Sequence, residues 1–146
     1  MKTNILMVCL GNICRSPLAE GVLKSKLSSN HFRIDSAATA SFHIGKPPDY
    51  RSIKIAADHG IDISLQKARV FKLEDFNLFD KIYVMDRNNL KIIKQLAETP
   101  EQRDKVSLIL ENEDLQDPYY GDESNFKIVF ELLNEACEKI KFDLIN

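Results

Sequence analysis

Short apolar runs that alternate with helical patterns are the feature that most limits what this chain can fold into. Residues 4–10 are almost continuously apolar, which is typical of a strand buried on both faces of a sheet. Three further strands are predicted at residues 32–37, 81–85 and 106–110. Because all four segments are short and are separated by longer polar stretches, they predict strands joined by helical connections.

Helical patterns fill the intervals between these runs. The first helix is predicted to begin with Ser16 as its N-cap residue and Pro17 at its first position. The other helices are predicted at residues 47–60, where Gly60 ends the pattern, and at residues 88–98 and 124–145. Apolar residues spaced for one face of the last helix are Phe126, Val129, Phe130, Leu133, Ala136, Cys137 and Ile140.

The alternation of strands and helices predicts an α/β fold. The length of 146 residues is most simply one domain, residues 1–146. We expect a four-stranded parallel sheet flanked by helices on both faces, in a flavodoxin-like, doubly wound arrangement. Ligands of such folds bind beyond the carboxyl ends of the strands, where the chain turns into a helix. The turn after the first strand is therefore the first place to look for chemistry.

The charge and the cysteine count exclude several classes of function. The net charge is −2 and the isoelectric point about 5.9, so no basic field favours nucleic acid or an anionic membrane as a partner. No apolar run approaches the roughly 20 residues that cross a bilayer. Three cysteines, an odd number, do not form the disulfide framework of a secreted protein. A cytoplasmic location is expected.

The first turn, CLGNICRSP, places a thiol and a guanidinium where a strand passes into a helix. A helix N-terminus offers free backbone amides to an oxyanion, and the planar fork of Arg15 can hold two oxygens of a phosphate. The same positive field favours the thiolate form of Cys9. Gly11 permits a close approach of the backbone, and Asn12 tolerates left-handed geometry. This pattern indicates a nucleophile at the floor of a phosphate site.

The order Cys9, five residues, Arg15, Ser16 resembles the signature of the low-molecular-weight protein tyrosine phosphatases. The resemblance covers the whole chain. Stretches that match the family in the same order are DSAATASFHIGKPPDYRS, DHGIDIS, VMDRNN and DPYYGD. A Cys-x5-Arg spacing alone would be a weak signal, but these stretches make the resemblance specific.

The resemblance implies a role for each matching residue. Cys9 would be the nucleophile that forms a phosphocysteine, and Arg15 would bind the phosphate and its transition state. Ser16 would donate a hydrogen bond to the Cys9 thiolate. Asp117 would protonate the leaving phenolate and then activate water. No cofactor and no metal are implied.

Further residues would bind the substrate or support the loop. The phosphate would be held by the loop residues and Ser16, namely Leu10, Gly11, Asn12, Ile13, Cys14 and Ser16. Asn12 would also hold the loop in shape, with Ser36 as a hydrogen-bond partner. Phe42, where the family often has Tyr or Trp, and Tyr119 would form aromatic walls for the phosphotyrosine ring, supported by Tyr120.

One position departs from the family pattern. A histidine that often precedes Ala-Arg in the family, and supports Asn12, is replaced here by Gln66. We expect Gln66 to donate the same hydrogen bond.

Several residues keep a second interpretation. Cys14 either packs the loop or resolves an oxidised Cys9, and we favour the second because both thiols belong to one tight loop. Asp117 before a proline is also typical of an ordinary turn, and only the matched DPYYGD favours catalysis. The three histidines have no carboxylate or cysteine at ligand spacing, so surface or capping roles are expected for His31, His43 and His59.

Alternative functions remain at this point. Arsenate reductases use the same fold and loop, but they need further cysteines, and residues 85–115 contain none. A non-catalytic phosphate or phosphopeptide-binding module would not need Cys9 and Asp117 together. A thiol oxidoreductase would prefer Cys-x-x-Cys, and a nucleotide-binding loop would need Gly-Lys-Ser/Thr. We expect a phosphotyrosine-containing protein as substrate, phosphate or vanadate as active-site ligands, and a monomer or weak dimer.

Overall fold

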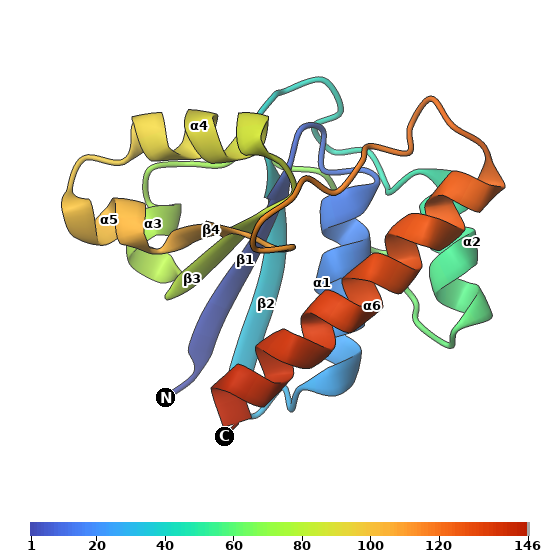
Figure 1. The fold of residues 1–146 in the computed structure, drawn as a ribbon, viewed down its shortest axis with the longest axis horizontal. Helices are drawn as coiled ribbons and strands as arrows, with labels where there is room; N and C mark the ends of the chain where they lie inside the picture. Colours follow the sequence, from blue (N-terminus) through green and yellow to red (C-terminus); the bar gives the residue numbers. More distant parts are fainter. Residues whose placement is uncertain (146) are drawn as a thin grey trace.

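The four predicted strands form one parallel sheet (Figure 1). The structure is a computed structural model that describes residues 1–145, so Asn146, the last residue of the predicted domain, lies outside the described residues. The sheet order is β2-β1-β3-β4, with bounds β1 (Thr3–Cys9), β2 (Phe32–Ala38), β3 (Lys81–Val84) and β4 (Val106–Leu108). The predicted α/β fold is confirmed, although β3 and β4 end one and two residues earlier than expected.

The strand order places a crevice at the end of β1. This strand pairs with β2 on one side, where Ile5 lies opposite Ile34, and with β3 on the other, where Ile5 lies opposite Lys81. The chain leaves β1 toward one neighbour and later returns to the other, so the connections diverge at the carboxyl end of β1. In open α/β sheets this is where ligands bind.

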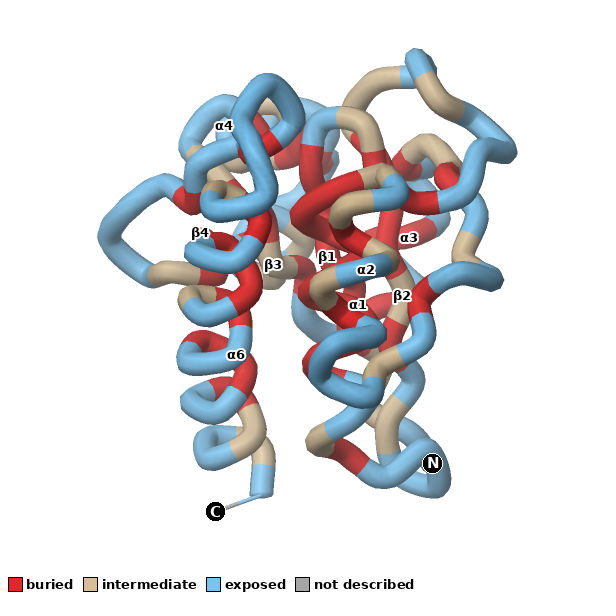
Figure 2. Tube along the Cα trace, turned by 90° about the vertical axis from the view of Figure 1, so that its right-hand side faces the viewer, coloured by how far each residue is buried: buried red, intermediate tan, exposed pale blue. Residues whose placement is uncertain are grey.

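β1 is buried on both of its faces, as its continuous apolar run predicted (Figure 2). Ile5, Met7 and Cys9 belong to the core that lies under α1 and α6, whereas Leu6 and Val8 belong to the core on the opposite face. Alternate side chains of a strand point to opposite faces, so one strand contributes to both cores.

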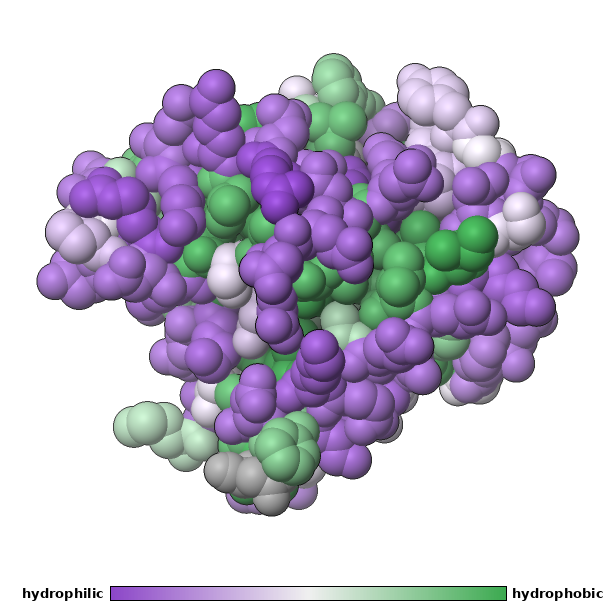
Figure 3. Space-filling model, in the orientation of Figure 1, coloured by the Kyte–Doolittle hydropathy of each residue, from purple (hydrophilic) through white to green (hydrophobic). Residues whose placement is uncertain are grey.

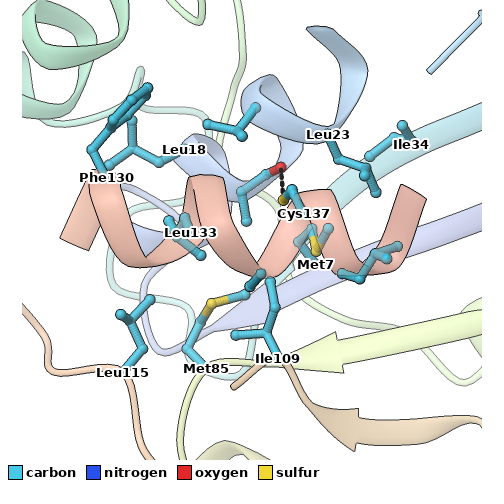
Figure 4. Packing of buried hydrophobic residues seen from close by; sticks show 14 of the residues in the cluster. Met7, Leu18, Leu23, Ile34, Met85, Ile109, Leu115, Phe130, Leu133 and Cys137 are labelled. Atoms are coloured by element: carbon cyan, nitrogen blue, oxygen red, sulfur yellow. Dashed lines mark hydrogen bonds between the residues drawn. The ribbon is translucent and has the colours of Figure 1, made fainter. Parts of the chain in front are cut away.

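The first core is covered by helices from both ends of the chain. Its helices are α1 (Arg15–Lys26), α2 (Tyr50–Asp58) and α6 (Glu123–Ile145), with α2 packed on the other two. Figure 4 shows Leu133 and Cys137 of α6 among Leu18 of α1 and Met7 of β1, and the Cys137 thiol donates to the Ala19 carbonyl at 3.9 Å. All seven residues predicted for the apolar face of α6 are buried.

On the side of the second core, the structure has two helices that the sequence analysis did not predict, α3 (Asp75–Leu78) and α5 (Pro100–Asp104). The helices on this face of the sheet, on the left of Figure 1, are α3, α4 (Arg87–Leu96) and α5. α3 is too short to show a periodic pattern, yet Phe76 is fully buried against the Phe71 ring, 5.0 Å away between centroids. α5 was missed because Pro100 marks the end of the preceding helical pattern. Pro100 is also the first residue of a new helix, and Thr99 is its N-cap residue.

The start of α1 differs from the prediction. The helix begins at Arg15, with Cys14 in the N-cap position, so the prediction of Ser16 as N-cap is wrong. The Ser16 hydroxyl instead contacts the Cys9 sulfur at 3.0 Å and accepts a hydrogen bond from Asn12. Within residues 1–145 no side chain caps the start of α1, which leaves its first amides facing the turn.

The surface is mostly hydrophilic in the view of Figure 3, with an apolar region beside the beginning of α6. A groove of about 190 Å³ runs there between α6 and the segment before it, and its apolar lining is Leu110, Leu115, Pro118, Ile128, Val129 and Leu132. No described helix, in the range 1–145, has the length and apolar character needed to cross a membrane.

Candidate active site

Three connecting segments meet at the carboxyl end of the sheet, at the top of Figure 1. They are the β1–α1 loop (residues 10–14), the β2–α2 segment (residues 39–49) and the β4–α6 segment (residues 109–122). Thr39 donates to the Cys9 carbonyl at 2.9 Å, and Leu115 donates to the Met85 carbonyl at 2.8 Å. The segments enclose a pocket of about 120 Å³ lined by Cys9, Leu10, Gly11, Ile13, Cys14, Arg15, Phe42, His43, Asp117, Tyr119 and Tyr120.

The thiol of Cys9 lies at the floor of this pocket. Cys9 is the last residue of β1 and is 3% exposed. The amide of Asn12 donates to its sulfur at 3.2 Å. Asn12 reaches this position because it adopts a left-handed conformation, φ +57°, as the sequence analysis predicted. The loop therefore folds back over the sulfur and directs a backbone dipole at it.

Gly11 lets the β2–α2 segment close against the β1–α1 loop. A Cβ atom at this position would lie 2.9 Å from the His43 ring. The α1 N-terminus opens into the same space, so a helix dipole and uncapped amides face the pocket.

Arg15 is buried, and its guanidinium is held from one side. Its Nη1 donates to an Asp86 carboxylate oxygen at 2.8 Å and to the Leu115 carbonyl at 2.8 Å. Its Nη2 lies 3.7 Å from an Asp117 carboxylate oxygen on the pocket side. The planar guanidinium is thus fixed through Nη1, and its Nη2 is turned toward Asp117, the predicted acid.

Asp86 is a site residue that the sequence analysis missed. It is the second residue after β3, and its side chain accepts a hydrogen bond from the Asn89 amide at 2.8 Å, which caps α4. The signal was available, because a carboxylate at the carboxyl end of a predicted parallel strand lies at the ligand-binding edge. Its spacing from Arg15, however, gave no indication of the contact.

A chain of hydrogen bonds runs behind the Cys9 thiol. Asn12 Nδ2 donates one hydrogen to Ser16 Oγ at 2.7 Å and the other to Ser36 Oγ at 2.9 Å. Ser36 in turn donates to Glu20 at 2.6 Å. Because Ser16 already accepts from Asn12, its own hydrogen is free to point at the Cys9 sulfur. The predicted contact between Asn12 and Ser36 is present.

Glu20 anchors the far end of this chain. Its carboxylate is buried and accepts from Lys24 at 2.6 Å. Burial raises the pKa of Glu20, although hydrogen bonds from Lys24 and Ser36 act in the opposite direction. The sequence analysis did not predict this residue, whose position four residues before Lys24 is also typical of an ordinary helix-surface pair.

Gln66 does not take the predicted position. It donates to the Pro17 carbonyl in α1 at 3.2 Å, and its own amide oxygen has no partner within residues 1–145. The side-chain oxygen of Asn12 accepts instead from the Arg69 backbone amide at 3.1 Å. The prediction that Gln66 supports Asn12 is therefore wrong, because a backbone group supplies that hydrogen bond.

Aromatic side chains form the rim of the pocket. Phe42 is 69% exposed, and its ring lies 6.3 Å from that of His43, which is 6.3 Å from the Tyr119 ring on the opposite segment. Tyr120 packs edge to face on Tyr119 at 4.9 Å. The predicted walls thus face the same space, and His43, expected in a surface or capping role, is a half-buried part of the rim.

Cys14 lies in the same loop as a second buried, free thiol. Burial, together with the negative charge of Asp49, raises the pKa of Cys14. This sulfur therefore stays protonated. Cys137, the third cysteine, is in the core under α6, where burial raises its pKa to about 12.

The described residues thus combine a thiol, a fixed guanidinium and a carboxylate around one small pocket with aromatic walls. This arrangement suits nucleophilic attack on a phosphoryl group and protonation of an aromatic leaving group. Within residues 1–145 no group of three or more His, Cys, Asp or Glu side chains is arranged to hold a metal ion.

Comparison with known proteins places this geometry in a family. The sequence model described as low molecular weight phosphotyrosine protein phosphatase matches residues 4–145. The chain belongs to this family. The prediction made from the CLGNICRSP stretch is therefore confirmed.

Relatives within the low molecular weight phosphatase family are similar over nearly their whole length. The low molecular weight phosphotyrosine protein phosphatase of Gallus gallus is 39% identical over 145 residues, covering 92% of this chain and 91% of the relative. A protein tyrosine phosphatase of Entamoeba histolytica has the same fold, with a TM-score of 0.91, 33% identity and coverage of 98% and 97% of the two chains. Wzb of Vibrio vulnificus, in complex with benzylphosphonate, gives a TM-score of 0.88, 31% identity and coverage of 98% and 99%.

Proposed function

We propose that this family member hydrolyses phosphotyrosine in proteins through a phosphocysteine intermediate. The observation that carries the proposal is the Cys9 thiol at the pocket floor, with Arg15 fixed beside it and Asp117 on the facing segment. Nucleophile, phosphate-binding fork and acid thus lie around a space large enough for one phosphoryl group.

In the first step the Cys9 thiolate attacks phosphorus, and the bond between phosphorus and the phenolic oxygen breaks. The phenolic oxygen takes a proton from the Asp117 carboxyl group, and the dephosphorylated tyrosine side chain leaves. Arg15 and the amides of the loop stabilise the charge on the equatorial oxygens. Asp86 keeps the guanidinium in the orientation that this requires.

In the second step a water molecule attacks the phosphocysteine. The Asp117 carboxylate takes a proton from the water, the bond between sulfur and phosphorus breaks, and phosphate is released. Ser16, whose hydrogen is free to point at the sulfur, stabilises the Cys9 thiolate as it leaves. Asp117 gives one proton to the leaving group in the first step and takes one from water in the second, so it returns to its starting state.

The walls support an aromatic substrate. Phe42 and Tyr119 rise on opposite segments above the thiol and offer faces on which a phenyl ring can pack. The benzylphosphonate in the Vibrio vulnificus relative joins an aromatic ring to a tetrahedral phosphorus group, as phosphotyrosine does. Phosphoserine would reach the phosphate site without contacting these walls.

The proposal extends to ligands, assembly and location. Phosphate and vanadate would bind the same loop, and the protein would act as a monomer or weak dimer. Three cysteines that are all free thiols fit the reducing conditions of the cytoplasm.

A comparison of substrates tests the proposed function. Turnover of phosphotyrosine, phosphoserine and arsenate is measured side by side in EDTA, with Cys9→Ser as the control. We expect turnover of phosphotyrosine by the wild-type protein alone, while the variant still binds vanadate through Arg15 and the loop amides. Reduction of arsenate, or full activity of Cys9→Ser, would contradict the proposal.

A further inference from the structure

Arg51, in the first turn of α2, connects three separate parts of the molecule. Its guanidinium pairs with both carboxylate oxygens of Asp49, through Nε and Nη2, each at 3.0 Å. Nη2 also donates to the Tyr119 carbonyl at 2.8 Å, and Nη1 donates to the Gly121 carbonyl at 2.9 Å. One side chain therefore joins the start of α2 to the β4–α6 segment.

The other end of this connection is fixed to the β1–α1 loop. The backbone amide of Asp49 donates to the Ile13 carbonyl at 2.7 Å, and the Ser52 hydroxyl donates to the Cys14 carbonyl at 3.4 Å. Burial disfavours ionisation of Asp49, but hydrogen bonds from the Arg51 side chain and backbone outweigh it and lower the pKa of Asp49. Asp49 stays charged and fixed, and it holds Arg51 in place.

The residues that follow Asp117 depend on Arg51. Two hydrogen bonds link residues 118–121 to other elements within residues 1–145, and Arg51 donates both of them. The Tyr119 amide then donates to the Asp117 carboxylate at 3.1 Å. The same peptide segment that Arg51 holds thus orients the Asp117 side chain.

Ring contacts add to this connection. The Arg51 guanidinium lies over the buried Phe126 ring of α6, 4.4 Å from its centroid, and 5.9 Å from that of Tyr119. A guanidinium stacked on an aromatic face keeps its plane fixed. The side chain is therefore oriented from below by Phe126 and from one edge by Asp49.

We propose that Arg51 is a positioning residue that holds Asp117 over the Cys9 loop for transfer of its proton to the leaving group. The inference rests on the proposed function, in which Asp117 is the acid. Arg51 does not itself line the pocket, and it contacts the lining at Tyr119. It therefore acts through the peptide between Tyr119 and Asp117. Its loss leaves the phosphate-binding loop complete but displaces the acid.

Arg87 provides a matched control. It also pairs with a carboxylate, Asp114 at 3.3 Å, and donates to a carbonyl of the same segment, that of Asn112 at 2.7 Å. Arg87 differs from Arg51 because it contacts residues before Asp117. That part of the segment is also held by Arg15, which donates to the Leu115 carbonyl. Removal of the Arg87 side chain is therefore expected to leave Asp117 in place.

The test compares Arg51→Gln, Arg51→Lys and Arg87→Gln by the rate of enzyme phosphorylation with a poor and a good leaving group. With phosphotyrosine we expect Arg51→Gln to lose about 10- to 100-fold, as displaced catalytic groups do. With an activated aryl phosphate, whose leaving group needs no proton, the loss is expected to be about 2-fold or less. Arg51→Lys should recover part of the loss, since an ammonium keeps the charge but not the fork.

A double variant and an exchange measurement separate positioning from folding. If Arg51 acts through Asp117, Arg51→Gln has no further effect in an Asp117→Ala protein. Amide hydrogen exchange in residues 117–121 should be faster in Arg51→Gln and unchanged in Arg87→Gln. Both readouts are recorded at a temperature where circular dichroism shows every variant folded.

Equal losses with both leaving groups, or additive effects with Asp117→Ala, would overturn the inference. The same holds if Arg87→Gln shows the same selective loss. If wild-type protein hydrolyses phosphotyrosine and Asp117→Ala shows the leaving-group effect, such results reject the role of Arg51 alone. If the wild-type protein hydrolyses no phosphotyrosine, the proposed function fails, and this inference fails with it.

Discussion

Asp117 is the site residue with the least local support, and its role depends on where the fold places it. Its carboxylate is partly exposed and lies 3.7 Å from the Arg15 guanidinium. It belongs to a segment without regular secondary structure, and the Tyr119 amide at 3.1 Å fixes its orientation. Arg15, in contrast, is buried and held by Asp86 and Leu115. The proposed phosphate-binding group, Arg15, is thus rigid, whereas the proposed acid, Asp117, depends on contacts with its neighbours.

Replacement of Asp117 by alanine is expected to reduce hydrolysis of phosphotyrosine by about 100-fold or more, because the phenolate must then leave without a proton. The loss should be much smaller for an activated aryl phosphate. The measurement is the phosphorylation rate as a function of leaving-group basicity. Glu113→Ala is the control, since it removes an exposed carboxylate from the same segment. A uniform loss for good and poor leaving groups would make Asp117 structural.

Among the elements, the β1–α1 loop contains two thiols with different environments. The Cys9 sulfur contacts Ser16 and the Asn12 amide, whereas burial and nearby Asp49 keep Cys14 protonated. Peroxide is therefore expected to oxidise Cys9 first. The Cys14 thiol would then condense with the Cys9 sulfenic acid and release water, which gives a disulfide.

Mild peroxide should inactivate the wild-type protein reversibly, with recovery in dithiothreitol. Cys14→Ser should recover less, because an unprotected Cys9 proceeds to sulfinic acid. Cys137→Ser is the matched control, as it removes a buried thiol far along the chain, in α6. Peptide mass spectrometry identifies the linkage. Recovery of Cys14→Ser equal to that of the wild type, with no linked Cys9 and Cys14 peptides, would contradict the prediction.

The whole molecule supports this site from beneath, through two cores on the two faces of one sheet. β1 contributes to both, and it ends in Cys9. α6 closes the first core over α1, so the chain's last helix stabilises the helix that starts at Arg15 (Figure 4). The stability of the β1–α1 loop and the stability of the fold are therefore linked.

Leu133→Ala in α6 is expected to lower the free energy of unfolding by about 2–5 kcal/mol, because it leaves a cavity at a fully buried position. This corresponds to a fall in the unfolding temperature on the order of 10 °C. Ile128→Ala on the same helix is the control, since Ile128 is 54% exposed and should change stability by about 0.5 kcal/mol or less. Thermal unfolding by circular dichroism measures both. Equal shifts would show that α6 does not seal this core.

The sequence by itself determined the fold class, the four strands and the chemistry of the first turn. These features are local: apolar runs of strand length, helical periodicity, and a Cys-x5-Arg spacing that brings thiol and guanidinium together within one turn. The buried face of α6 could be predicted for the same reason, since a period of 3.6 residues identifies the residues that share one face. Ser36 as a partner of Asn12 came from the family resemblance.

Only the tertiary structure decided which distant groups complete the site. Asp86 and His43 reach it from other elements, and Glu20 of α1 joins it through Ser36 of β2; no spacing in the sequence encodes those contacts. The predictions for Ser16 and Gln66 were wrong for the same physical reason. Ser16 does not cap α1 because Cys9 and Asn12 use its hydroxyl. Gln66 does not replace the histidine because the Arg69 backbone amide already satisfies Asn12. Hydrogen-bond donors and acceptors are assigned by the folded neighbourhood as a whole, so local preference is overruled wherever a distant partner satisfies the same group.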